Sequence, residues 1–422
     1  MFPDYRNKKA VVIGLARSGV AAANLLNDLG AKVFVTDNAD NPKVKSQASD
    51  LRAKGIDVET GGHTMDFIRG KDLVVISPGV PDESQALLWA KEFDLPVISE
   101  IELAWQQCPA TIIAVTGSNG KTTVTTLIAE ALKTKGARCF ALGNIGLPFS
   151  ACVRDTTSED YVSLEASSFQ LERVESFRPR VALITNFTQN HLDKNHRGYA
   201  DISEYLRAKK RIFMNQGKDD YLVLNEDDPV LKSLSKEAKS KIVFFRAKTE
   251  LNANQSAVMA VASIFGVNEN SCREVFRNFK GVEHRFEFVR TIKGVRFIND
   301  SKATTTDSTR WALNSISSRA ILIAGGQDKG LDYGVISDIV KEKVRVLILI
   351  GEAKEKIRKA FEGIIPIKVA SSLEEAVDIG FKEARNGDAV LLSPMCASFD
   401  MFDDFEHRGR EFKEIVNKLH DI

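Results

Sequence analysis

Residues 112–123 read Ile-Ile-Ala-Val-Thr-Gly-Ser-Asn-Gly-Lys-Thr-Thr, and the fold can be worked out from this stretch. Ile112–Thr116 is a run typical of a strand buried on both faces, and a helical pattern covers Thr122–Lys135. The glycine-rich turn between them places backbone N–H groups, a helix N-terminus and a lysine where a triphosphate can bind. A purely structural strand–helix turn is disfavoured, because the strand, the loop and the helix all have the pattern of a phosphate-binding site.

The loop is a variant of the general phosphate-binding pattern. That pattern has a glycine six residues before the lysine, where Val115 stands here, so the motif is T-G-x-x-G-K-T. We expect the lysine to reach the terminal phosphates and the first threonine hydroxyl to bind Mg²⁺. The predicted ATP-binding residues of the loop are Gly117, Ser118, Asn119, Gly120, Lys121, Thr122 and Thr123.

On both sides of this motif, short apolar runs lead through polar turns into helical patterns. Such units predict an α/β fold with mostly parallel sheets, and the length predicts about three domains. We place the domains at residues 1–97, 98–281 and 282–422. The predicted strands are Ala10–Ile13, Lys32–Thr36, Leu73–Ser77, Val97–Ser99, Ile112–Thr116, Tyr161–Leu164, Val181–Thr185, Tyr221–Leu224, Arg319–Ala324, Val344–Ile350 and Ala389–Ser393; helices are expected at Val20–Leu29, Thr122–Lys135 and Ser203–Asn215.

A weaker nucleotide signal lies near the N-terminus. Residues 14–19, Gly-Leu-Ala-Arg-Ser-Gly, join a strand to a helix, and Asp37 ends the next strand, where an acid can meet a sugar hydroxyl. Ala16 replaces the middle glycine of the dinucleotide fingerprint, which counts against an NAD-dependent oxidoreductase. A nucleotide-sugar site and a merely structural turn both stay open. The loop at residues 77–81 either covers the same ligand or is only a rigid turn.

More polar residues follow central strands, at the edge where ligands of open sheets collect. Glu165 and His191 stand after two such strands and could hold a metal facing the loop, although a lone histidine there is more often structural. Lys209 shares a helix face with Tyr205, so it points inward, whereas Lys210 faces solvent. A charge run on a helix is usually only a solvated face.

The last third of the chain repeats this arrangement. Polar groups follow strands at 299–304, 325–329 and 393–400, as expected where a further domain closes over a site. Cys396 could be a nucleophile, but no base lies near it in the sequence, so a small buried residue is favoured.

Composition excludes several classes of protein. Lys and Arg number 58 against 57 Asp and Glu, so bulk charge does not favour binding to nucleic acid. No apolar run approaches the length of a membrane span or a signal peptide. The five cysteines are scattered and never spaced as C-x-x-C, which indicates reduced thiols and a cytoplasmic protein that does not bind membranes.

Five motifs, in order along the whole chain, resemble the Mur ligases: Thr116-Gly-Ser-Asn-Gly-Lys-Thr, Gly143-Asn-Ile-Gly, Leu164-Glu-Ala-Ser-Ser-Phe-Gln-Leu-Glu, His284-Arg-Phe-Glu and Asn299-Asp-Ser-Lys-Ala-Thr. Within the family they look most like the branch that adds D-glutamate to UDP-N-acetylmuramoyl-L-alanine. The resemblance implies a Rossmann-like UDP-binding domain, a central P-loop ATPase-like domain and a C-terminal Rossmann-like α/β domain. It also implies ADP-forming amide synthesis through an acyl phosphate in peptidoglycan precursor synthesis, and with it roles in cell-wall biogenesis, cell shape and division, by a chain expected to be a monomer.

The resemblance implies a role for each matching residue. Lys121, Glu165, His191 and Lys209 are expected to be catalytic, with Thr122, Glu165, His191 and a carbamylated Lys209 at two Mg²⁺ sites. The UDP-substrate is expected at Arg17, Ser18, Asp37, Ser77, Gly79, Asn144 and His191, and ATP additionally at Asn254, Arg285 and Asp300. D-glutamate is expected at Lys302, Thr304, Lys329, Ser398 and Phe405.

The carbamate also has a physical argument. Mg²⁺ prefers oxygen ligands and an ammonium would repel it, while burial lowers the pKa of a lysine toward the neutral amine that adds CO₂. The alternative is a cationic Lys209 paired with Glu165 or Asp193.

The sequence departs from the family in places. Asn190 stands where an acid is usual before the histidine, and residues 253–257 keep one asparagine of the adenine segment. Rival functions are another amino-acid-adding Mur-type ligase, a folylpolyglutamate synthase, an NAD-dependent oxidoreductase and a non-catalytic nucleotide-binding regulator. About 100 residues precede the P-loop, which counts against the synthase.

Overall fold

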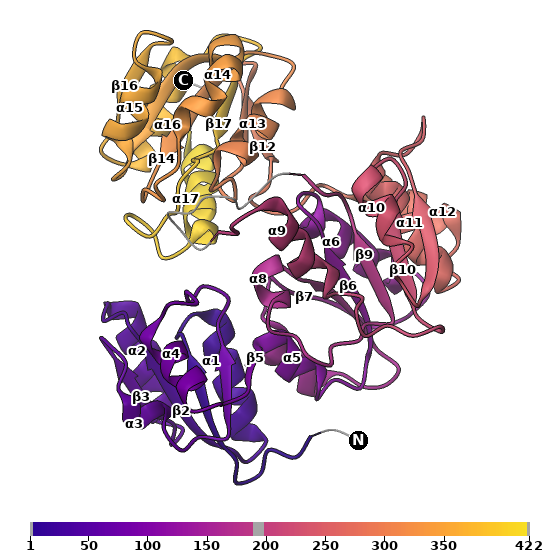
Figure 1. The fold of residues 1–422 in the computed structure, drawn as a ribbon. Coiled ribbons are helices and arrows are strands. Elements are labelled where there is room, and N and C mark those ends of the chain that lie inside the picture. Colours follow the sequence, from indigo (N-terminus) through magenta and orange to yellow (C-terminus); the bar gives the residue numbers. More distant parts are fainter. Residues whose placement is uncertain (1–2, 189–197, 420–422) are drawn as a thin grey trace. The chain divides into compact units, whose positions relative to one another are not determined.

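The computed structural model describes residues 3–188 and 198–419. Contacts divide the chain into two compact units, Met1–Phe279 and Lys280–Ile422, each drawn in Figure 1. The first unit contains two parallel sheets and the second a mixed sheet. The predicted α/β fold class is confirmed, while the division into three domains at 97/98 and 281/282 stays a prediction.

The N-terminal sheet has five parallel strands in the order β3-β2-β1-β4-β5. They are β1 (Lys9–Ile13), β2 (Lys32–Asp37), β3 (Asp57–Thr60), β4 (Leu73–Ile76) and β5 (Val97–Ser99); the helices are α1 (Arg17–Asp28), α2 (Pro42–Arg52), α3 (Met65–Ile68), α4 (Gln85–Glu92) and α5 (Glu100–Trp105). Strand β3 was not predicted, because Val58 is its only apolar residue and an edge strand needs few.

The central sheet has six parallel strands in the order β11-β10-β9-β6-β8-β7. They are β6 (Thr111–Thr116), β7 (Cys139–Gly143), β8 (Tyr161–Glu165), β9 (Val181–Ile184), β10 (Tyr221–Asn225) and β11 (Lys241–Phe245). The helices are α6 (Lys121–Lys133), α7 (Phe149–Cys152), η1 (Val153–Asp155), α8 (Ser168–Leu171), α9 (Ile202–Lys210), α10 (Pro229–Leu234), α11 (Ala253–Ile264) and α12 (Glu269–Asn278).

The C-terminal sheet has the order β12-β13-β17-β14-β15-β16, and only its edge strand β12 runs antiparallel to its neighbour. Its strands are β12 (Glu287–Ile292), β13 (Val295–Asn299), β14 (Ala320–Gly325), β15 (Val344–Ile350), β16 (Ile367–Val369) and β17 (Ala389–Leu392). The helices are α13 (Thr306–Asn314), η2 (Tyr333–Ile336), α14 (Ser337–Lys343), α15 (Lys354–Phe361), α16 (Leu373–Glu383) and α17 (Phe405–Lys418).

Strand β6 shows why the central strands are mostly apolar. Ile112 and Ala114 belong to the core on one face of the sheet, whereas Ile113 and Val115 belong to the core on the other. A strand covered on both faces needs apolar side chains at every position. This burial holds β6, and the loop that follows it, at the middle of the sheet.

Helix α9 is shorter than predicted and ends at Lys210. The next residues turn with tighter hydrogen bonds, such as Phe213 N to Lys210 O. The Arg211 side chain donates to the carbonyls of Leu171 and Val174, which draws the chain toward α8. Periodicity alone could not show this contact.

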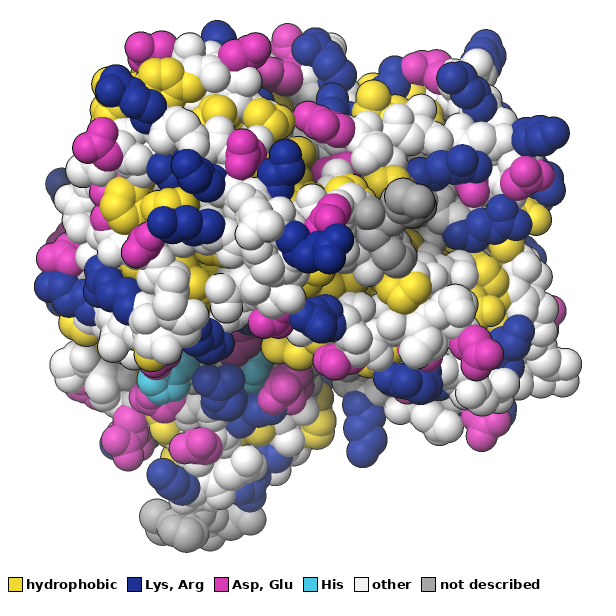
Figure 2. Space-filling view, turned by 90° about the horizontal axis from the view of Figure 1, so that it is seen from below, with side chains coloured by type: hydrophobic (Ala, Val, Ile, Leu, Met, Phe, Trp, Pro, Cys, Tyr) yellow, Lys and Arg dark blue, Asp and Glu magenta, His cyan; other side chains and the backbone are white. Residues whose placement is uncertain are grey.

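Surface charges are mixed. Basic and acidic side chains are interspersed over the face shown in Figure 2, in keeping with a net charge of +1. Within the described part of the chain, no helix is long and apolar enough to cross a membrane.

A buried carboxylate, Glu102 on α5, holds the chain that follows α8. Its side chain is fully buried and accepts from the backbone N–H groups of Glu175, Ser176 and Phe177 at 3.0, 3.1 and 2.9 Å. Gln106 and the Ser176 hydroxyl also donate to it. Such donors satisfy the charge of a carboxylate that would otherwise be costly to bury.

We expect Glu102→Ala to lower the free energy of unfolding by about 3 kcal/mol, because three N–H groups, of which the Phe177 N–H is buried, lose their acceptor. Chemical denaturation followed by circular dichroism would measure the change. Glu130→Ala, which removes an exposed carboxylate paired with Lys133, should cost less than about 0.5 kcal/mol. Equal losses for the two variants would contradict this account of Glu102.

Candidate functional site

Two glycines give the loop after β6 a shape that no other residue could adopt. Gly117 has φ +145°, and a Cβ there would lie 2.0 Å from Thr185 Oγ1. Gly120, which precedes the first residue of α6, has φ +80°, and a Cβ there would lie 2.5 Å from Asn254 Oδ1. The loop therefore contacts both the end of β9 and the start of α11, where Asn254 lies beside Gly120.

The chain that follows β9 braces this loop. Asn186 accepts from Ser118 N through its carbonyl at 3.0 Å and from Asn119 N through its side chain at 2.8 Å. The Thr185 hydroxyl donates to the Asn119 carbonyl at 2.6 Å. Sequence reasoning missed Thr185 and Asn186 as part of the site, although their place at the end of a central strand was a usable signal.

Lys121 is the first residue of α6, and its amine lies over the loop. It donates to the carbonyls of Gly117 and Ser118, each at 3.0 Å. Thr122 follows and is 2% exposed. The first N–H groups of a helix have no acceptor within it, so the start of α6 can receive an anion.

Glu165, at the end of β8, has one carboxylate oxygen that accepts a hydrogen bond from the protein and one that does not. Oε1 accepts from Asn144 Nδ2 at 2.9 Å, whereas Oε2 is buried without a hydrogen-bond partner. A buried, partnerless carboxylate oxygen is costly unless a cation or a proton meets it. The residues present therefore fit a magnesium ion at this edge.

The metal-ligand set cannot be completed from the described residues. His191 lies outside them, as do Asn190 and Asp193. Within residues 3–188 and 198–419 there is no group of three or more His, Cys, Asp or Glu side chains suited to a metal.

Lys209 points inward from α9, as predicted, and is 1% exposed. Its amine donates to the Gly117 carbonyl at 2.8 Å and lies 4.4 Å from the centre of the Tyr205 ring. Burial, and then the nearby charge of Lys121, hold the pKa of Lys209 well below its usual value. It contacts neither Glu165 nor a surface acid in the described residues; the adjacent Lys210 pairs with Glu237.

The N-terminal glycine turn is built for close backbone approach. A Cβ on Gly14, which has φ +96°, would lie 2.8 Å from Ser77 Cβ, and the Ser77 hydroxyl donates to the Gly14 carbonyl at 3.1 Å. Asp37 accepts from Leu15 N at 2.5 Å and from Ala39 N at 2.7 Å. Asp37 and Ser77 thus fix the turn that precedes Arg17 and Ser18 at the start of α1.

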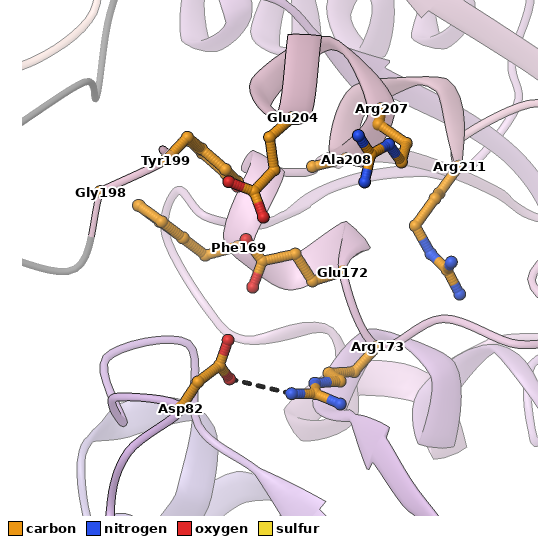
Figure 3. Close-up of a pocket in the computed structure, with 10 residues that line it drawn as sticks. All are labelled: Asp82, Phe169, Glu172, Arg173, Gly198, Tyr199, Glu204, Arg207, Ala208 and Arg211. Atoms are coloured by element: carbon orange, nitrogen blue, oxygen red, sulfur yellow. Dashed lines mark hydrogen bonds and ion pairs between the residues drawn. The ribbon is translucent and has the colours of Figure 1, made fainter. Parts of the chain in front are cut away.

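A cavity of about 250 Å³ lies between the N-terminal domain's Asp82 and helices α8 and α9 (Figure 3). Asp82 Oδ1 and Arg173 Nη2 form an ion pair at 2.9 Å across it. Glu172, directly after α8, and Glu204 on α9 extend into the space, and Arg207 lies on the same side as Glu204. Sequence reasoning did not identify these lining residues, because the cavity forms only where the two sheets' loops meet.

In the C-terminal unit, the residues expected to bind D-glutamate follow three neighbouring strands. Strand β17 pairs in parallel with β13 on one side and β14 on the other, so their carboxyl ends meet at one edge. Lys302 and Thr304 follow β13, Lys329 follows β14 and Ser398 follows β17, whereas Phe405 is the first residue of α17. The Lys302 amine lies 5.5 Å from the centre of the Phe405 ring.

Arg408 on α17 ties this edge together and was missed by sequence reasoning. It is fully buried and donates to the Ser301 hydroxyl and carbonyl at 2.9 and 2.8 Å, and to the Cys396 carbonyl at 3.3 Å. Ser301 in turn donates to the Phe405 carbonyl at 2.8 Å. Cys396 is fully buried, as the structural interpretation predicted.

Asp300 follows β13 and is 3% exposed. It accepts from Ser393 Oγ at 2.9 Å and from Phe286 N at 3.1 Å. Burial raises the pKa of this carboxyl to about 7, although both hydrogen bonds and the charge of Arg285 oppose the rise. The charge of Arg285 thus acts on Asp300 within the C-terminal unit, and their shared role in binding ATP stays a prediction.

Comparisons with known proteins cover the whole chain. Three family models match it: Mur ligase MurD-like, N-terminal domain (residues 8–99), Mur ligase middle domain (115–283) and Mur ligase, glutamate ligase domain (284–396). The UDP-N-acetylmuramoylalanine--D-glutamate ligase of Koribacter versatilis is 39% identical, over 99% of this chain and 98% of its own. The enzyme of the same name from Chloroherpeton thalassium is also 39% identical, over 99% of both chains.

Solved structures share the fold. UDP-N-acetylmuramate-alanine ligase MurC from Thermotoga maritima matches with a TM-score of 0.63 and 18% identity, over 97% of this chain and 99% of its own. A pseudomurein peptide ligase type C from Methanothermus fervidus matches with a TM-score of 0.58 and 19% identity, over 98% and 100%.

The raised pKa of Asp300 predicts a pH dependence of stability. The folded chain keeps this proton between pH 3.8, the usual pKa, and about 7, where the unfolded chain has released it. Stability from this group is therefore lost as the pH rises through that window. The free energy of unfolding of Asp300→Asn, measured with urea, should increase relative to that of wild type as the pH rises from about 5 to about 8. Parallel pH profiles for the two proteins would contradict the assignment.

Proposed function

The chain belongs to the Mur ligase family, and we propose that it is the ATP-dependent, ADP-forming ligase that adds D-glutamate to UDP-N-acetylmuramoyl-L-alanine. The observation that carries the proposal is the buried Glu165 oxygen without a partner beside a braced phosphate-binding loop. A second site with two lysines, at one edge of the C-terminal sheet, supports an amino acid with two carboxylates.

In this proposal the loop residues 117–123 hold the ATP phosphates, with Asn254, Arg285 and Asp300 contributing further ATP contacts. The Lys121 amine exchanges the carbonyls of Gly117 and Ser118 for phosphate oxygens, which it neutralises. Thr122, Glu165 and His191 hold Mg²⁺, which when bound screens the charge of the phosphates.

The substrate carboxylate attacks the terminal phosphoryl group and forms an acyl phosphate and ADP. The amine of D-glutamate then attacks the acyl carbon, and phosphate leaves. The protein mainly positions the groups and balances their charge, because phosphoryl transfer needs little covalent help. Lys302, Thr304, Lys329, Ser398 and Phe405 orient the D-glutamate.

We also propose that the UDP-substrate lies along the N-terminal turn, at Arg17, Ser18, Asp37, Ser77 and Gly79, and reaches Asn144 and His191. The support is the close-packed Gly14 turn, whose backbone approaches a ligand at the start of α1. The cavity lined by Phe169, Arg173 and Arg207 lies between this turn's domain and the segment after Glu165.

Lys209 is proposed to be a carbamate that serves as an oxygen ligand for a second Mg²⁺. Its burial and its lowered pKa favour the neutral amine that adds CO₂. A carbamate also replaces a cation that otherwise shares the Gly117 carbonyl with Lys121.

Amino-acid-dependent release of phosphate from ATP tests the proposed reaction. With UDP-N-acetylmuramoyl-L-alanine present, D-glutamate should support faster release than L-glutamate, L-alanine or diaminopimelate. Faster release with diaminopimelate would favour another Mur-type ligase, and turnover with a folate in place of the UDP-substrate would favour a folylpolyglutamate synthase. Either result would overturn the proposal.

Lys329→Ala should raise the Michaelis constant for D-glutamate about tenfold or more, because a partly buried cation that meets a carboxylate is lost. The constant for ATP should change little. Lys341→Ala, on the exposed part of α14, is the matched control and should change neither. Equal rises for both substrates would point to a folding defect instead.

Lys209→Ala should lower kcat by about a factor of 10²–10³ or more, since the proposed oxygen ligand of the second Mg²⁺ is lost. Acetate should restore part of the rate by supplying oxygen atoms. Lys210→Ala, whose side chain pairs with Glu237 at the surface, should retain activity. An unmodified Lys209 in the mass spectrum or density map of a fully active, magnesium-loaded enzyme would refute the carbamate.

A further inference from the structure

Tyr333 opens η2 and joins two loops through one hydroxyl group. The side chain is 2% exposed within the C-terminal core. Its hydroxyl donates to Asp328 Oδ1 at 3.0 Å and lies 3.2 Å from Cys396 Sγ. Asp328 stands in the loop after β14 and Cys396 in the loop after β17, so the hydroxyl connects the ends of two neighbouring strands.

These two loops carry residues that the proposed function assigns to D-glutamate. Lys329 directly follows Asp328, and Ser398 lies two positions after Cys396. Ser398 is 2% exposed, and Lys329 is also largely buried, so neither has much freedom to adjust its position. The distance between the two side chains therefore depends on how the loops are held together.

The loops also meet at a second point, through their backbones. Gln327 N donates to the Ala397 carbonyl at 2.9 Å. Gly326 has φ +133°, and a Cβ there would lie 2.2 Å from the same carbonyl oxygen. Two separate contacts, one between backbones and one through Tyr333, fix the orientation of one loop relative to the other. With a single contact, one loop could rotate about it.

Asp328 is held from several sides. The Lys356 amine donates to its Oδ2 at 2.9 Å and to its Oδ1 at 3.2 Å, and Gly330 N donates to Oδ1 at 3.0 Å. Asp328 and Gly330, on either side of Lys329, are thus hydrogen-bonded to each other, and Tyr333 connects them to the neighbouring loop. The Lys356 amine also lies 5.5 Å from the centre of the Tyr333 ring.

We propose that Tyr333 is a positioning residue that sets the spacing between Lys329 and Ser398, and with it the length of amino acid that the site accepts. The inference rests on the proposed function, because it assumes that these two side chains meet D-glutamate. D-aspartate has the same charges with one methylene fewer, so only spacing separates the two substrates. A shift of about 1 Å in a positioning group is enough to cost up to 10²-fold in rate.

The test is Tyr333→Phe, which keeps the ring and removes the hydroxyl. We expect the Michaelis constant for D-glutamate to rise about tenfold, with the constants for ATP and for the UDP-substrate within about twofold of wild type. The preference for D-glutamate over D-aspartate, measured as a ratio of kcat/KM values, should fall. Tyr5→Phe removes another largely buried tyrosine hydroxyl, bound to Gln106, and should leave all these constants unchanged.

A double-variant cycle shows whether Tyr333 acts through Lys329. In Lys329→Ala the spacing no longer matters, so adding Tyr333→Phe should change the constant for D-glutamate by less than about twofold. Asp328→Asn, which weakens the same link from the other end, should reproduce the D-glutamate effect of Tyr333→Phe. Melting temperatures of all variants show whether each is folded.

Three results would overturn the inference. If Tyr333→Phe melts earlier and all three Michaelis constants rise together, the hydroxyl only stabilises the fold. If the D-glutamate constant and the D-aspartate discrimination stay at wild-type values, the spacing does not depend on it. If the wild-type enzyme shows no D-glutamate-dependent turnover, the proposed function fails first, and this inference fails with it.

Discussion

The carbonyl oxygen of Gly117 accepts hydrogen bonds from two lysine amines, Lys121 at 3.0 Å and Lys209 at 2.8 Å. Two ammonium groups on one acceptor repel each other, and this repulsion adds to burial in lowering the pKa of Lys209. The shape of the loop makes the arrangement possible, because Gly117 fits against Thr185 only without a side chain. In the proposed function, a bound triphosphate would give Lys121 a better partner, and a carbamate on Lys209 would remove the second cation.

In all three sheets, the burial of both faces restricts where polar side chains can lie. Parallel strands buried on both faces have few polar positions within the sheet, so most polar side chains gather where the strands end. In the central sheet that edge carries the loop and Glu165, and in the N-terminal sheet it carries the Gly14 turn with Asp37 and Ser77. The C-terminal sheet, within its own unit, carries two lysines, and Arg408 and Tyr333 tie its loops together.

Sequence patterns predicted what depends on neighbours along the chain. The buried strands, the phosphate-binding loop and the inward face of Lys209 follow from apolar runs, glycine spacing and helical periodicity. The list of predicted strands lacks β3, β7, β11, β12, β13 and β16, and α9 ends earlier than predicted. Strand β3 has little apolar signal, and the end of α9 depends on Arg211 reaching α8. Glu102 and Tyr333 could not be assigned either, because their partners lie on segments distant in the sequence or on another loop.

Diffraction from crystals grown with Mn²⁺ and a non-hydrolysable ATP analogue tests the central claim most directly. Mn²⁺ replaces Mg²⁺ at oxygen sites, and its anomalous signal locates the ion independently of the protein atoms. The account predicts an ion bound directly to Glu165 Oε2 and the Thr122 hydroxyl, with the Lys121 amine moved from the Gly117 carbonyl to the phosphates. An ion bound elsewhere, with Lys121 still on its own loop, would contradict it.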